Sequence, residues 1–359
     1  MDDRRILGID GLRGIAILLV VFYHSFSRWT ELYPYGDQYK NELLFNYGWV
    51  GVQLFFMISG FVIYMSLDNS KGFDNFIYKR WLRLFPAMLC ATLIVFASSF
   101  FLTHRPAGNP SLLSIVPGLT FIEYGWWKKI LGLNFNELEG AFWSIYAEFK
   151  FYVIAAFVYF YFSKRMLPYV IFSMFLLFKV SYFFSDMKLM YYLYKLMGTL
   201  SFEHFGWFSV GCFFYRYFKN GKDKNSLYFT IFSFLLSIIL NKSYIDFTLY
   251  FVLFFVGALF FLSVKSHFVG KVLSSPIVIF FGFVSYPLYL VHENSLVSMM
   301  IQLSDILNTE NVFVIFLLSF SIVIFVSYVI AKRLEPLVRG KIKNIIGCFF
   351  NFSNKGRSV

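Results

Sequence analysis

The chain has 359 residues, of which 58% are hydrophobic and only 14% are charged, and 51 of them are phenylalanine. No water-soluble core of this size could absorb so many aromatic side chains, so the composition excludes a soluble domain and is typical of a polytopic membrane protein. The net charge of +12 could suggest a nucleic-acid partner, but basic loops on one side of a membrane explain it better. The three cysteines lack metal-ligand spacing, so we expect no disulfide framework and no metal site.

Apolar runs of about twenty residues predict an all-α bundle of about ten transmembrane helices. The ten runs are roughly 6–28, 46–67, 84–102, 143–162, 167–185, 191–215, 226–240, 246–264, 276–301 and 312–331. We therefore expect one transmembrane domain over residues 1–335, followed by a short basic tail over residues 336–359. An even number of spans would place both termini on the same side of the membrane.

The loops between these runs predict the orientation of the chain. If the N-terminus is placed inside, the inside segments carry 21 Lys and Arg residues and the outside segments carry 8. Because Lys and Arg accumulate in cytoplasmic loops, this bias predicts that both termini are cytoplasmic. It also accounts for the net positive charge, so we expect membrane lipids and no nucleic acid around the protein.

The first apolar run, 6–29, is interrupted by Asp10, Arg13 and His24. Such groups are costly in a bilayer unless they are paired or face a cavity, so they are functional candidates. Asp10 can pair with Arg13 at i,i+3. Arg13 and His24 share one helix stripe, about 16 Å apart along the axis. A packing salt bridge and a hydrogen-bonded core histidine are an equally good alternative.

Two arginines, Arg80 and Arg83, lie one turn apart at the expected cytoplasmic mouth of the third span. Two guanidinium groups on one helix face can bind phosphate groups through bidentate hydrogen bonds. The alternative is ordinary anchoring by positive charge, which an isolated R-x-x-R pair would usually represent.

The second and fourth spans contain further polar residues. Ser59 and Gly60 permit a close helix approach, which by itself is a packing feature. Ser144 and Glu148 share one helix face, and Glu148 lies more than one turn inside an apolar run. A carboxylate at that depth needs a cation or a proton, and the alternative to a functional role is a structural ion pair with another helix.

The ninth span carries Ser285, Tyr289 and His292 on a single stripe, and Pro287 is expected to kink the helix. These polar groups could instead join helices through hydrogen bonds. The long outside segment 103–142 holds prolines, a tryptophan pair and several acids, Glu139 among them. It is either a connecting loop with interfacial anchors or part of an outer substrate vestibule.

Taken together, five motifs in chain order resemble the acyltransferase-3 family of integral membrane acyltransferases, which includes bacterial O-antigen and exopolysaccharide O-acetyltransferases. The motifs are IDGLRGIAILLVVFYH, FFMISGF, FIYKRWLRLFPA, FWSIYAEFKFY and SYPLYLVH. Two departures stand out. Phe149 occupies a position where the family often has a second acid, and Pro287 replaces a residue that is usually small or polar.

The resemblance implies a membrane O-acyltransferase that moves an acyl group, most simply acetyl from acetyl-CoA, to a hydroxyl of a lipid-linked or surface glycan such as O-antigen, capsule or exopolysaccharide. It implies a multi-pass protein of the bacterial cytoplasmic (inner) membrane, with acyl-CoA as a substrate and no permanently bound cofactor. It marks Arg13 and His24 as essential and places Arg80 and Arg83 at the donor side. With the polar positions described above, we therefore expect catalysis by His24, Arg13, Glu148 and Tyr289 and donor binding by Arg13, Arg80 and Arg83. We expect supporting roles for Asp10, Ser59, Ser144, Tyr286 and His292.

Two other functions compete with this interpretation. A transporter or flippase for a glycan, a lipid or an acyl precursor would also place charged groups inside the membrane. Against it, the sequence has neither an inverted repeat nor a pair of broken helices. The other is a non-catalytic scaffold for polysaccharide assembly, which predicts that His24 is dispensable.

Overall fold

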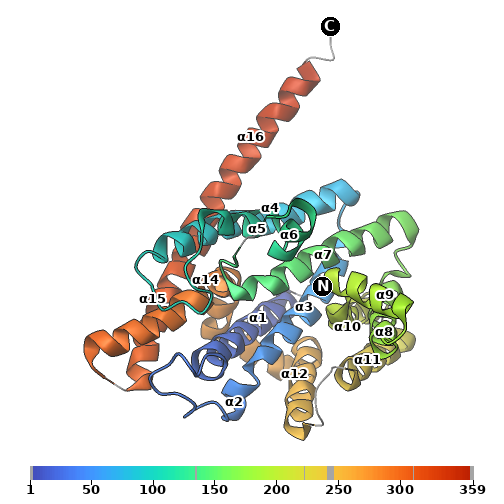
Figure 1. Ribbon diagram of the computed structural model, residues 1–359. Helices are drawn as coiled ribbons and strands as arrows, with labels where there is room; N and C mark the ends of the chain where they lie inside the picture. Colours follow the sequence, from blue (N-terminus) through green and yellow to red (C-terminus); the bar gives the residue numbers. More distant parts are fainter. Residues whose placement is uncertain (1–2, 134–135, 222, 241–245, 310, 356–359) are drawn as a thin grey trace. The chain divides into compact units, whose positions relative to one another are not determined.

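The computed structural model describes residues 3–133, 136–221, 223–240, 246–309 and 311–355 (Figure 1). These residues are predominantly helical and include no strand, which confirms the predicted all-α fold. Lys222 and Lys242, which entered the loop charge count, lie outside the described residues, as do residues 356–359 of the expected tail.

Seven helical segments in the described part of the chain are long and apolar enough to cross a membrane, which makes this a multi-pass membrane protein. They are Gly8–Arg28, Gly48–Asp68, Phe73–Ser98, Gly140–Phe162, Phe247–Lys265, Pro276–Leu307 and Val312–Ile346. Two shorter apolar helices, Leu167–Phe183 and Lys224–Ile239, match two more of the predicted runs. The predicted count of about ten spans is thus not confirmed.

The predicted sixth span, 191–215, is not one helix. It is divided between α9 (Lys188–Thr199) and α10 (Phe205–Lys219). Between them Ser201 has a φ of 61°, in the left-handed region, which interrupts the helical path. Gly198 lies in the last turn of α9 and Gly206 in the first turn of α10, but a hydropathy average over the whole apolar run does not reveal the break.

Two helices extend beyond their predicted boundaries, one at its start and one at its end. The third span is α4 (Phe73–Ser98), which begins eleven residues before the predicted start at 84, so Arg80 and Arg83 lie within a regular helix. The last span, α15 (Val312–Val329), continues through a π turn (Ile330–Leu334) into α16 (Glu335–Lys355). The basic segment expected as a tail is therefore helical as far as the structure describes it.

The chain forms two compact units. The first comprises residues 1–31, 36–78 and 142–285, and the second comprises residues 32–35, 79–141 and 286–359. The first unit contains α1 (Asp3–Tyr23), α2 (Leu43–Asn46), α3 (Gly51–Asp68), α7 (Trp143–Phe157), α8 (Leu167–Phe183), α9, α10, α11 (Lys224–Ile239), α12 (Phe247–Lys265) and α13 (His267–Leu273). The second contains most of α4, then α5 (Ile115–Thr120), α6 (Tyr124–Leu131), α15 and α16. The long helix α14 (Pro276–Leu307) contributes its first ten residues to the first unit.

The core of the first unit is built on glycines that bring helix backbones together. A Cβ atom at Gly60 of α3 would lie 2.0 Å from the carbonyl oxygen of Phe208 on α10. Likewise, a Cβ at Gly282 of α14 would lie 2.1 Å from the carbonyl oxygen of Asp10 on α1. Small residues at such crossings let membrane helices pack closely. The crossing at Gly282 holds the backbone beside Arg13 in a fixed position.

Candidate functional site

Asp10 and Arg13 form the predicted ion pair on α1. The Arg13 Nη1 atom donates to Asp10 Oδ1 at 2.6 Å, and both side chains are only part-exposed, at 27% and 38%. This confirms the i,i+3 pairing that the spacing indicated. A guanidinium group has five N–H donors, and this contact uses one of them. Most of the hydrogen-bonding capacity of Arg13 is therefore not used by its acidic partner.

His24 stands where α1 changes into a π turn, His24–Arg28. Its Nδ1 atom lies 3.0 Å from the carbonyl oxygen of Val20. A carbonyl can only accept a hydrogen bond, so Nδ1 carries the proton in the neutral ring and Nε2 keeps the lone pair. The half-buried imidazole is thus in the tautomer that a general base or a nucleophile requires at Nε2. Single π turns often occur at functional sites, and the apolar pattern did not predict this one.

Glu148 on α7 is held by hydroxyl groups. Its Oε1 atom accepts from Ser59 on α3 and from Tyr152 on its own helix, both at 2.6 Å. In the part of the chain that the structure describes, no cation forms an ion pair with this carboxylate. The alternative of a structural ion pair for Glu148 is therefore wrong for these residues.

The hydrogen bond from Ser59 to Glu148 links the motif of the second span with that of the fourth span, and the sequence did not predict this contact. Ser59 was predicted as a packing residue, but it also supplies a hydrogen bond to Glu148. Tyr152 was missed, although its i,i+4 spacing from Glu148 could have identified it. Ser144 is buried one turn before Glu148, and Lys150 bonds elsewhere, to the carbonyl of Thr199 and the hydroxyl of Ser201.

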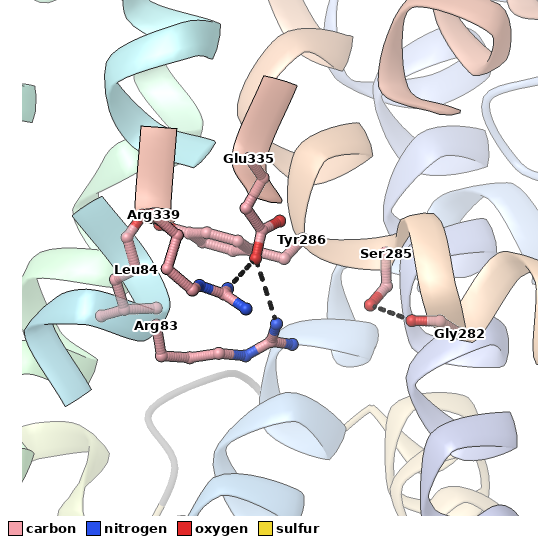
Figure 2. A network of polar contacts seen from close by, with 7 residues as sticks. All are labelled: Arg83, Leu84, Gly282, Ser285, Tyr286, Glu335 and Arg339. Carbon is pink, nitrogen blue, oxygen red and sulfur yellow. Dashed lines mark hydrogen bonds and ion pairs between the residues drawn. The ribbon is translucent and has the colours of Figure 1, made fainter. Parts of the chain in front are cut away.

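The polar side chains of the predicted stripe on α14, Ser285, Tyr289 and His292, form hydrogen bonds with backbone carbonyls. The Tyr289 hydroxyl donates to the carbonyl of Ala141 at 3.0 Å, and His292 Nδ1 lies 2.9 Å from the carbonyl oxygen of Tyr289. Ser285 donates to the carbonyl of Gly282 at 2.8 Å, as Figure 2 shows. These bonds agree with the alternative of structural hydrogen bonding. That Glu148, Tyr289 and His24 line one cavity stays a prediction, because Tyr289 belongs to the second unit.

Arg83 takes part in a charged cluster in the second unit. Its Nη1 atom lies 3.5 Å from Glu335 Oε1, and Arg339 Nη2 donates to that same oxygen (Figure 2). Beside it, the Tyr286 hydroxyl donates to the carbonyl of Leu84 at 3.1 Å and joins α14 to α4. Arg80 lies one turn earlier on α4, on the face that the spacing predicted. Glu335 and Arg339 lie about 250 residues away along the chain, so the spacing of the motifs did not predict them.

A second charged cluster of the same unit surrounds Glu139, which precedes α7. Glu139 is 2% exposed, and its Oε2 accepts from the backbone N of Asn294 at 3.1 Å and from its Nδ2 at 2.7 Å. Burial, and next the negative charge of buried Glu293, raise the pKa of Glu139 to about 8. The Glu293 carboxylate lies against Gly140, where a Cβ would come within 2.9 Å of Oε2. Residues 138–140 of segment 103–142 are therefore packed onto α14.

Arg105 completes this cluster. The side chain is 5% exposed and donates to the carbonyls of Leu138 at 2.7 Å, Val95 at 3.1 Å and Gly108 at 3.3 Å. Burial lowers the pKa of Arg105, and the charge of Glu139 opposes that shift. Among the described residues, no three His, Cys, Asp or Glu side chains gather in a way that could hold a metal ion.

Comparison with known proteins places these residues in a family. The model of the acyltransferase domain family matches residues 6–332. A Staphylococcus aureus (strain COL) protein, provisionally named an O-acetyltransferase, is 24% identical over 333 residues, which are 80% of this chain and 50% of that protein. The peptidoglycan O-acetyltransferase OatA of Listeria monocytogenes is 25% identical over 162 residues, which are 41% of this chain and 23% of that protein.

A protein of Bacillus subtilis (strain 168), provisionally named a peptidoglycan O-acetyltransferase, is 29% identical over 167 residues, 42% of this chain and 23% of that protein. The chain thus spans half or less of the length of these curated relatives. No solved structure matches it. The family match includes every motif from Asp10 to His292 and confirms the resemblance. The chain belongs to the acyltransferase-3 family, and residues 6–332 form its acyltransferase domain.

Proposed function

We propose that the protein is a membrane O-acyltransferase that moves an acetyl group from acetyl-CoA in the cytoplasm to a hydroxyl of a lipid-linked or surface glycan. The family match supports acyl transfer, and relatives named O-acetyltransferases, two of them for peptidoglycan, support acetyl and a glycan. The observation that carries the proposal is the bond from His24 Nδ1 to the Val20 carbonyl, which leaves a lone pair on Nε2.

The reaction needs that lone pair because a sugar hydroxyl is a poor nucleophile at neutral pH. His24 Nε2 takes the hydroxyl proton as the oxygen attacks the thioester carbonyl. The new C–O bond forms, the C–S bond breaks, and the proton on Nε2 passes to the departing thiolate of coenzyme A. In a covalent variant Nε2 itself attacks the thioester carbonyl, and the C–S bond breaks to release the coenzyme A thiolate. The acceptor oxygen then attacks the acetyl group, the C–N bond to Nε2 breaks, and the hydroxyl proton passes to the thiolate.

The donor enters from the cytoplasmic side in this proposal. Arg80 and Arg83 bind its phosphates, and the unused donors of Arg13 contact the pantetheine or the thioester end. In this proposal Glu148 and Tyr289 line the same polar cavity as His24. Glu148 accepts hydrogen bonds from Ser59 and Tyr152. The loop charges support an orientation with both termini cytoplasmic, and the family supports a bacterial cytoplasmic membrane as the location.

Exchange of His24 for an amide tests the proposal. An amide is neither base nor nucleophile, so His24→Gln and His24→Ala should abolish acetylation of surface glycans, measured by mass spectrometry, while the protein still inserts. His267→Gln is the matched control, because this exposed histidine lies outside the site and its loss should leave acetylation unchanged. Substantial glycan acetylation by a well-expressed His24→Gln variant would refute both the base and the covalent mechanism.

A further inference from the structure

The cluster of Arg83, Glu335 and Arg339 combines a buried acid with part-exposed bases. The Glu335 side chain is 8% exposed, whereas those of Arg339 and Arg83 are 31% and 51% exposed. Both guanidinium groups contact the same oxygen, Glu335 Oε1 (Figure 2). The acid therefore lies beneath two positive groups that retain access to solvent.

The cluster contributes little to the stability of the fold, but it orients the two arginine side chains. An ion pair that is half-exposed, like that of Arg83, contributes little to folding. A shared carboxylate nevertheless fixes two long side chains at one point, although they come from α4 and α16. Ordering those side chains before a ligand arrives lowers the entropy cost of binding it.

The cluster has spare capacity for an anion. The two arginines and one carboxylate leave a net positive charge, and each guanidinium spends only part of its donors on Glu335. Arg339 Nε is buried and has no hydrogen-bond partner among the described residues. Glu335 is also the single acid within residues 332–343, which include Lys332, Arg333, Lys341 and Lys343. Planar guanidinium forks that converge on one point suit a phosphate group.

We propose that Arg339 joins Arg83 in binding a phosphate of the acyl donor, and that Glu335 is the positioning residue that holds the two guanidinium groups together. The inference rests on the proposed function for its choice of coenzyme A as the phosphate source. A phosphate in an anionic lipid headgroup has the same chemistry, so the experiment must separate these two sources.

The test measures the affinity of the purified full-length protein for coenzyme A and for vesicles that contain phosphatidylglycerol. Arg339→Gln should weaken coenzyme A binding about tenfold. Arg339→Lys should weaken it about fivefold, because an ammonium group keeps the charge but not the fork. Lys343→Gln is the matched control: it removes the same charge from an exposed position one turn further along α16, and should change affinity by less than about twofold.

Three outcomes would overturn the inference. If the unmodified protein binds coenzyme A and Arg339→Gln behaves like Lys343→Gln, the inference fails while the proposed function stands. If coenzyme A does not bind at all, both fail. If Arg339→Gln weakens only the vesicle interaction, the phosphate belongs to a lipid and the assignment to the donor is wrong.

The role of Glu335 has a separate signature. In the Glu335→Gln background, Arg339→Lys should cost less than about twofold in coenzyme A affinity, because the fork is no longer held beside Arg83. A purely structural Glu335 would leave the full fivefold cost in place, and that result would remove its positioning role. If Glu335→Gln does not fold, Glu335→Asp replaces it: the shorter acid should reduce the cost of Arg339→Lys, and an unchanged cost would exclude the positioning role.

Discussion

The second unit contains two charged clusters, each with a buried carboxylate, that differ in charge balance and in exposure to solvent. At Glu335 one acid faces two arginines that are 51% and 31% exposed, so positive charge is in excess and open to solvent. At Glu139 one arginine faces two acids, and all three residues are at most 5% exposed. The first cluster is suited to receive an anion, whereas the second holds segment 138–141 onto α14.

The partners of the arginines explain the difference. Arg105 donates to three backbone carbonyls, so its capacity is used by the fold itself. Arg83 bonds one carboxylate and keeps most of its donors. A buried cation that bonds several backbone carbonyls is structural, while a part-exposed cation that bonds one buried acid can bind a ligand. Exposure and the number of acceptors therefore separate the two roles better than charge does.

The sharpest way to break this comparison is to remove each arginine in turn. Arg105→Gln should destabilise the protein by about 3 kcal/mol or more, because it leaves carbonyls and two acids buried without their cation. Arg83→Gln should cost less than about 1 kcal/mol, since that side chain is half-exposed. Thermal unfolding in detergent measures both effects. An equal loss of stability in the two variants would contradict the distinction.

The pH dependence of stability gives the next largest effect. Glu139 has a folded pKa of about 8, above its ordinary value near 4.5, so the folded state binds more protons than the unfolded state between these limits. The stabilising contribution is complete below about pH 4.5 and is lost as pH rises toward 8, by up to about 1.4 kcal/mol per pH unit.

Glu139→Gln should remove this slope, because an amide resembles the protonated acid and does not titrate. The unfolding midpoint of the variant should then stay nearly level between pH 6 and 8.5, while that of the unmodified protein falls. Asp37→Asn is the control, because Asp37 is exposed and its pKa is lowered by hydrogen bonds from Thr30 and Lys40, so it does not titrate in this range. A slope that persists in Glu139→Gln would assign the titration to another group.

A smaller effect is expected at Glu148, where neutral hydroxyls take the place of arginines. Tyr152→Phe removes one of the two hydrogen bonds to Oε1 and should cost about 1–2 kcal/mol, because the acid loses a hydrogen-bond partner inside the protein. Tyr161→Phe, at an exposed position near the end of the same span, should be neutral. Thermal unfolding of both variants is the measurement. A neutral Tyr152→Phe would mean that Ser59 alone satisfies the carboxylate.

Local features of the site were predictable from the sequence, and long-range ones were not. The Asp10–Arg13 pair and the shared face of Arg80 and Arg83 follow from helix periodicity alone. The bond between Ser59 and Glu148 joins residues 89 positions apart, and that between Arg83 and Glu335 joins residues 252 apart. Hydropathy shows that such polar groups need partners, but only the packing of helices decides which partners they meet.

The same limit applies to the fold. Apolar length identified the spans because a membrane imposes it on any crossing helix. It failed at Ser201, where a single left-handed residue divides α9 from α10, and it placed the start of α4 too late because Lys79, Arg80 and Arg83 interrupt the apolar pattern without interrupting the helix. A hydropathy average over twenty residues does not report the backbone conformation of a single residue.

The π turn at Ile330–Leu334 makes the cluster at Glu335 depend on the backbone conformation of one helical turn as well as on the residues that form the cluster. A π turn takes up one more residue than an α turn, so it rotates the helix that follows by about 100°. If this turn became plain α-helix with all of its residues kept, Glu335 and Arg339 would rotate together by that angle, away from Arg83. Every side chain of the cluster would still be present, on the wrong side of the helix.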